Sequence, residues 1–188
     1  MFQDICFPKG NEREFVEIAR RLGTKSLVFV YYFNDQKSLE EKKKEVQAFA
    51  DFRIDVGVLV DEKNINKIHV NDEFVFSKNP SKSLIENKKT YILYDFETGE
   101  KPDFLHHRNS GLNQVLCELI KKKEKMVGIS FSIILNAQKQ GIMLGRMAQN
   151  ARFLRKYKLD KVVASFASTP YELRAEHEIR SFEKILGL

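Results

Sequence analysis

The chain has 188 residues and a formal net charge of +6 at pH 7. Hydrophobic residues make up 43% and charged residues 31% of it, a composition that excludes disordered and fibrous proteins. The positive charge is concentrated in residues 108–161, where twelve Lys or Arg and three Asp or Glu give +9, while the remainder carries −3. A one-sided positive field attracts polyanions. A basic surface that only keeps the protein soluble is the alternative.

Size and hydropathy predict one globular domain over residues 1–188. The longest strongly apolar run, residues 27–33, is far too short to cross a bilayer. The first four residues lack the basic flank and apolar stretch of a secretion signal. The two cysteines, Cys6 and Cys117, have no metal-ligand spacing and are typical of buried free thiols in a reducing compartment. We therefore expect a cytosolic protein without membrane partners.

A short β-rich run followed by a helical stretch recurs along the chain. Strands are predicted at 2–7, 26–33, 54–60, 68–76, 90–95, 103–107, 126–132 and 161–166. Helical periodicity is found at 12–22, 38–50, 82–89, 111–124, 140–158 and 170–186. Some runs, such as 27–30 and 56–60, are apolar on successive residues, which is typical of parallel strands covered on both faces.

Alternating strands and helices with right-handed crossovers predict an α/β protein, either an open doubly wound sheet or a barrel. Eight candidate strands favour the barrel, although the chain is short for a complete (β/α)₈ barrel. We therefore expect a trimmed, TIM-barrel-like fold whose helices are short or missing, notably between 76 and 103.

Cap residues mark three helix starts. Ser38 with Glu41 predicts one capping box, and Thr169 with Glu172 predicts another, with proline in the first helical position. Ser110 is the predicted cap of the helix that begins at the next residue.

Four runs in the second half of the chain form a specific pattern. They read HHRNSGL from residue 106, VGISFS from 127, LGRMAQN from 144 and RKYK from 155. The pattern resembles archaeal ribonuclease P protein component 3, the family that includes the eukaryotic thirty-kilodalton ribonuclease P subunit. The resemblance is close over 103–175, loose over 1–60 and faint over 61–102.

The resemblance implies a polymerase-and-histidinol-phosphatase-like barrel that acts as a non-catalytic protein subunit of a ribozyme. In ribonuclease P, the RNA subunit carries the active site and removes the 5′ leader of precursor tRNA by Mg²⁺-assisted hydrolysis. The implied partners are the ribonuclease P RNA, precursor tRNA and a smaller protein subunit of ferredoxin-like fold, paired with this chain in a heterotetramer. No cofactor is expected on the chain itself, and Mg²⁺ belongs to the RNA subunit.

Two arginines are predicted to bind phosphate on one rim of the barrel. Arg108 follows the predicted strand 103–107, and Arg174 follows 161–166, so both fall in strand-to-helix connections, which open on the same rim. Guanidinium groups beside helix N-termini suit phosphate, and the family pattern has an arginine at both positions. The alternative is an ion pair with a nearby acid, such as Glu172 or Glu176.

Two helices carry the other candidate contact residues. Lys122 and Lys123 belong to a lysine cluster with Lys121 and Lys125 at the end of the helix 111–124, where lysines also suit the helix dipole. On the helix 140–158, basic and amide side chains are placed opposite an apolar stripe. The candidates for RNA or partner contact there are Arg146, Arg152, Lys156 and Phe153, of which Phe153 could instead be buried under a loop.

No catalytic constellation is found in the sequence. The stretch 2–7 has no histidine, although phosphoesterases of this barrel type need a His-x-His pair there. His106 and His107 are adjacent and would point to opposite faces of a strand; His107 is a candidate rim residue near Arg108. The rival functions are a stand-alone barrel enzyme for a phosphorylated small molecule, gripped by Arg108 and Arg174, and a scaffold for acidic proteins.

Overall fold

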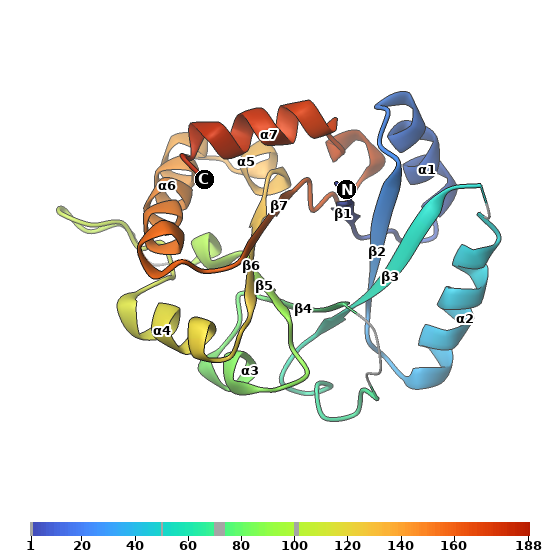
Figure 1. The fold of residues 1–188 in the computed structure, drawn as a ribbon, viewed down its shortest axis with the longest axis horizontal. Coiled ribbons are helices and arrows are strands. Elements are labelled where there is room, and N and C mark those ends of the chain that lie inside the picture. Colours follow the sequence, from blue (N-terminus) through green and yellow to red (C-terminus); the bar gives the residue numbers. More distant parts are fainter. Residues whose placement is uncertain (1, 50, 70–73, 100–101) are drawn as a thin grey trace.

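The computed structural model describes residues 2–49, 51–69, 74–99 and 102–188. Seven parallel strands follow one another in chain order around a nearly closed barrel (Figure 1). The strands are β1 (Asp4–Cys6), β2 (Ser26–Tyr32), β3 (Arg53–Val60), β4 (Phe74–Lys78), β5 (Ile92–Tyr94), β6 (Met126–Ser130) and β7 (Lys161–Ala164). The α/β, TIM-like architecture expected from the sequence is thus confirmed.

The gap between the first and last strands is bridged just beyond β7. Cys6 and Ala167 form a parallel bridge, with the Phe7 N–H donating to the Ala167 carbonyl at 2.8 Å. Asp4 accepts two hydrogen bonds from Ser165, one from the backbone N–H and one from the hydroxyl, both at 2.6 Å. Desolvation nevertheless raises the pKa of the buried Asp4 to about 6. These contacts link the two ends of the seven-stranded sheet formed by the described residues.

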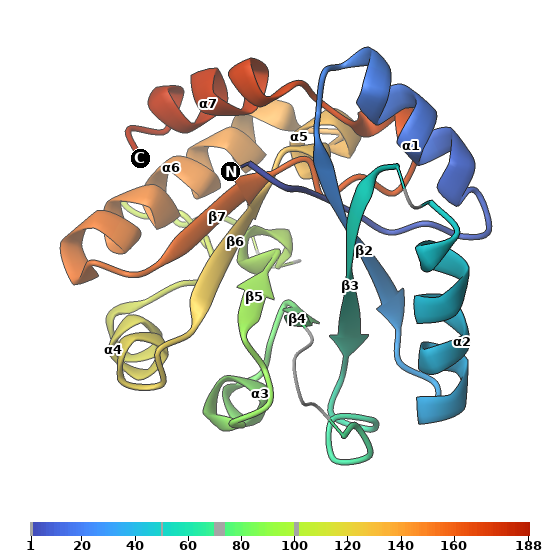
Figure 2. The same ribbon diagram turned by 45° about the vertical axis from the view of Figure 1, so that its right-hand side comes forward.

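Helices cover the outside of this ring (Figures 1 and 2). They are α1 (Glu12–Arg21), α2 (Gln36–Gln47), α3 (Lys82–Glu86), α4 (Gln114–Lys122), α5 (Ser132–Asn136), α6 (Gln140–Tyr157) and α7 (Glu176–Ile185). Two 3₁₀ turns, η1 (Phe96–Thr98) and η2 (Pro170–Glu172), follow β5 and β7. Among the described residues between 76 and 103, the helical elements are α3 and η1, so the expected trimming is confirmed. Within the described ranges, no helix combines the length and hydropathy needed to cross a membrane.

Aromatic and aliphatic side chains fill the barrel interior. Ile5, Val28, Phe76, Tyr94 and Phe166 come from different strands or strand ends and pack together as one buried cluster. Separate clusters lie between the strands and the outer helices, the largest beneath α4, α6 and α7. Burial on both faces explains the uninterrupted apolar runs of the strands.

Two strand predictions differ from the structure. Residues 103–107 form a loop, because β5 and β6 pair directly, with Ile92 opposite Met126, and leave no place for a strand between them. Within the predicted strand 68–76, β4 begins only at Phe74, and residues 70–73 lie outside the described residues.

Two predicted caps are wrong and one is partly right. The cap of α2 is Asp35 and not Ser38. The Asp35 carboxylate accepts a hydrogen bond from the Ser38 N–H at 2.8 Å. Asn113 caps α4, while Ser110 is buried before that helix begins. Glu172 does accept hydrogen bonds from the backbone N–H groups of residues 168 and 169. The proline starts a 3₁₀ turn there, however, and α7 begins only at residue 176.

Candidate nucleic-acid interface

Residues 102–113, which precede α4, form a loop that extends outward from the barrel beside α6 (Figure 1). Asp103 organises its base. One carboxylate oxygen accepts from Arg146 Nε at 2.8 Å and from the Asn109 N–H at 3.0 Å, and the other lies 3.2 Å from Arg108 Nη1. Desolvation alone would raise the pKa of Asp103, but the hydrogen bonds, led by that of Arg146, outweigh it and hold the pKa below its usual value.

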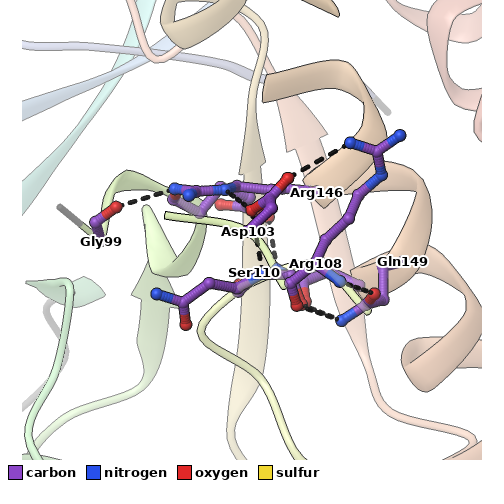
Figure 3. A network of polar contacts seen from close by, with 9 residues as sticks. Gly99, Asp103, Arg108, Ser110, Arg146 and Gln149 are labelled. Atoms are coloured by element: carbon purple, nitrogen blue, oxygen red, sulfur yellow. Dashed lines mark hydrogen bonds and ion pairs between the residues drawn. The ribbon is translucent and has the colours of Figure 1, made fainter. Parts of the chain in front are cut away.

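Arg146 fixes this loop from within. Its side chain is only 8% exposed, and its Nη1 donates to the carbonyls of Glu97 at 2.9 Å and Gly99 at 2.8 Å (Figure 3). Arg146, predicted to lie opposite the apolar stripe of its helix as a candidate RNA or partner contact, is instead buried within the chain. Partners from η1 and the loop cover this part of α6 and satisfy the guanidinium, so Arg146 is a positioning residue.

Two amides on α6 hold the backbone of the loop. Gln149 accepts from the Arg108 N–H at 3.0 Å, and its Nε2 donates to the Arg108 carbonyl and the Ser110 hydroxyl, both at 2.8 Å (Figure 3). Asn150 donates to the Ser110 carbonyl and to the buried carboxylate of Glu97, both at 2.8 Å. Sequence reasoning missed both roles, since an amide on a helix gives no signal of the loop that it contacts.

The glycine of the RNSGL motif has a steric role. Gly111 has a φ of +82°, and a Cβ added there would be 2.1 Å from the Phe96 carbonyl oxygen. The following Leu112 is buried in the core cluster under α4 and α6. The motif therefore anchors the loop at its end and leaves Arg108 near the surface, with a side chain 46% exposed.

Arg108 and Arg174 both lie in strand-to-helix connections, as predicted, but each has its own setting. The Arg108 guanidinium lies against Gly145 of α6. Arg174 donates to the carbonyls of Tyr171 and Leu173 at 3.0 and 2.7 Å, and its Cζ lies 5.4 Å from the centre of the Phe131 ring. The described contacts do not join the two guanidiniums to each other.

Helices α4 and α6 pack side by side and carry a group of exposed cations. We define the α4–α6 basic surface as Lys121, Lys122, Arg152 and Lys156. None of these four side chains forms an ion pair with a described residue, although the Lys156 ammonium lies 5.3 Å from the centre of the Tyr157 ring.

The other predicted contact residues differ in their surroundings. Lys123 is partly exposed at the end of α4. Lys125, predicted to join the lysine cluster, is buried and donates to the carbonyls of residues 87, 88 and 90, and desolvation lowers its pKa. Phe153 is partly buried, packs against the core cluster and stacks on Tyr157 with ring centres 6.3 Å apart.

The histidines do not alternate across a strand, because their segment is a loop. His107 is exposed and stacks on Phe104 with ring centres 4.5 Å apart, close to Arg108 in the chain. His106 is exposed in the same loop. In the part of the chain that the structure describes, no three His, Cys, Asp or Glu side chains are grouped closely enough to hold a metal ion.

Fold and site together define a trimmed α/β barrel with an ordered, arginine-bearing loop and a basic outer face. Comparison with known proteins confirms the resemblance to ribonuclease P protein component 3. The chain is 26% identical to that protein of Methanosarcina mazei, over the whole chain and 81% of the relative. It is 24% identical to that of Methanocaldococcus jannaschii, over 82% of the chain and 70% of the relative.

A solved structure has the same fold. A chain from the cryo-EM structure of archaeal ribonuclease P with mature tRNA superposes with a TM-score of 0.76 at 19% sequence identity. The superposition covers 99% of this chain and 83% of that one. No family model matches the sequence.

Proposed function

We propose that this chain is a non-catalytic, RNA-binding subunit of ribonuclease P that supports removal of the 5′ leader from precursor tRNA. The observation that carries the proposal is the likeness to ribonuclease P protein component 3 over the whole length of the chain. In the proposed cytosolic complex, the RNA subunit performs the Mg²⁺-assisted hydrolysis. This chain contributes positive charge and a fixed shape.

The α4–α6 basic surface is the proposed site of phosphate contact. Exposed Lys and Arg side chains release counterions when they approach a phosphate backbone, which makes binding strong at low salt and weak at high salt. Because these cations lie on two packed helices, their backbone positions are already fixed before binding. Neutralising folded RNA in this way lowers the Mg²⁺ concentration that the RNA needs.

Arg108 and Arg174 are proposed to contact RNA at separate points. Each guanidinium is held by carbonyls, a carboxylate or an aromatic ring, so it loses little rotamer entropy on binding. Arg108 also retains exposed surface from which it can reach a phosphate. The protein partner would be the smaller ferredoxin-like subunit, in a heterotetramer with this chain.

The test is to capture the tagged chain from its own cells and sequence the RNA that accompanies it. Enrichment of the ribonuclease P RNA is the expected result. Recovery of acidic proteins without RNA would support the scaffold function instead. Metal-stimulated hydrolysis of small phosphate esters by the purified chain would support the enzyme function, with Arg108 and Arg174 as the phosphate grip.

A further inference from the structure

The mouth of the barrel contains a hollow of about 440 Å³ that has no place in the function proposed above. It lies where β1 and β3–β7 end, and α5 and the start of α6 form part of its wall. Three of its lining side chains are aromatic. The rings of Phe7 and Tyr94 stack at 5.8 Å, and those of Tyr94 and Phe166 stack at 5.0 Å. These three stacked rings form the aromatic wall of the hollow.

Asp95 is the unusual residue of this hollow. It directly follows β5, has a left-handed backbone with φ +63°, and is 4% exposed. One carboxylate oxygen lies 3.4 Å from Lys78 Nζ, and the other is buried without a hydrogen-bond partner. A buried acceptor without a partner and a strained backbone both cost free energy, and such costs concentrate at ligand sites.

The chemistry of the hollow restricts the ligand. A carboxylate lacking a donor calls for N–H or O–H groups and repels free phosphate or carboxylate. The aromatic wall favours a planar ring. Lys78, whose side chain is 58% exposed at the rim, can leave Asp95 and meet an anion at the entrance. A nucleotide combines a planar donor edge with a phosphate, and its size suits a hollow of this volume.

We propose that the barrel mouth binds one unpaired guanine base, with its neighbouring N–H donors on Asp95, its ring against the aromatic wall and its phosphate beside Lys78. Guanine is the base whose Watson–Crick edge offers two adjacent N–H donors to one carboxylate. The base belongs either to a free nucleotide or to an unstacked nucleotide of an RNA. The second source rests on the proposed function.

The first arm of the test uses free nucleotides. The full-length chain is titrated with GMP and with AMP, and binding is followed by chemical shifts of the backbone amides around Asp95. Saturable binding of GMP is expected, about tenfold tighter than that of AMP, the size of one good base contact. Asp95→Asn keeps the shape and tolerates the left-handed backbone, and it should remove the preference. Equal binding of GMP and AMP, or an unchanged preference in the variant, would overturn the proposal.

The second arm uses single-stranded uridine oligonucleotides with one central G or one central A. If the base comes from RNA, the wild-type chain prefers the G oligonucleotide and Asp95→Asn binds both alike. If it comes from a free nucleotide, only GMP shows the preference. Absence of a preference for GMP over AMP, together with salt-dependent RNA binding, would refute the guanine site and leave the proposed function intact. Absence of any RNA binding would refute the proposed function alone.

Discussion

The guanidinium of Arg108 lies directly on the backbone of Gly145: a Cβ added to that glycine would be 2.4 Å from Arg108 Cζ. The same guanidinium is paired with Asp103, and the backbone of Arg108 is held by Gln149. The Arg108 guanidinium can thus occupy this position because Gly145 has no side chain.

Gly145→Ala should displace Arg108 without unfolding the protein. Alanine improves helix propensity by up to about 1 kcal/mol, while its methyl group forces the guanidinium away. We expect ribonuclease P activity, reconstituted at low Mg²⁺, to fall to the level of Arg108→Ala. The double variant should show no additional loss, as residues that act as one unit are not additive.

The matched control is Gly141→Ala in the same helix, where an added Cβ meets nothing within 4 Å. That variant should keep full activity and gain stability in urea unfolding. Equal activity of the two alanine variants would contradict the role given to Gly145.

Gly111→Ala should be strongly destabilising. The residue combines a left-handed φ of +82° with a backbone oxygen 2.1 Å from the new Cβ. Gly10 has a similar φ of +85° but open space around it. Gly10→Ala should therefore lower the free energy of unfolding by about 1 kcal/mol, through the backbone conformation alone. Gly111→Ala should lower it by about 2 kcal/mol more, because Phe96 must move. Urea unfolding of both variants measures the difference, and equal losses would contradict the close approach.

Stability should depend on pH through Glu97. Desolvation raises the pKa of this buried carboxyl to about 7, above its ordinary value of 4.5. One of its oxygens accepts from Asn150, and the other has no partner. Between pH 4.5 and 7, Glu97 therefore keeps its proton in the folded state but has lost it in the unfolded state. Across that window, the free energy of unfolding falls as the pH rises.

Glu97→Gln should remove this part of the pH dependence, because the amide stays neutral. The difference in free energy of unfolding between the variant and the wild type should shift in favour of the variant by on the order of 2 kcal/mol from pH 5 to pH 8. The contribution from Asp4, which is not among the groups that act on Glu97, is common to both proteins and cancels in the comparison. Urea unfolding at the two pH values is the measurement, with the exposed Glu118→Gln as a control. A difference that does not change with pH would rule out a buried proton on Glu97.

The α4–α6 basic surface should set the salt dependence of RNA binding. Replacing Arg152 and Lys156 by alanine should reduce the slope of log affinity against log salt by about 2, one for each lost phosphate contact. Lys37 and Lys44 are exposed on α2, and their double alanine variant removes the same charge elsewhere. If both double variants change the slope equally, net charge is responsible and not this surface.

The sequence predicts the barrel well because burial on both faces leaves a clear signal, as in residues 27–30 and 56–60. It predicts less of the site because the decisive partners are distant in sequence. Arg146 looks like a solvent-facing cation until Asp103 and the carbonyls around η1 are brought to it. The segment 103–107 has strand-like residues, yet β5 and β6 pair directly and leave it outside the sheet.

The central claim is that this chain assists an RNA catalyst and does not itself cleave. The most direct test is cleavage of precursor tRNA by the ribonuclease P RNA and the other subunits across a Mg²⁺ titration, with and without this chain. Adding the chain should move activity to lower Mg²⁺, and Arg108→Ala with Arg174→Ala should reverse much of that shift. Identical curves with and without the chain, or cleavage by the chain in the absence of RNA, would contradict the account.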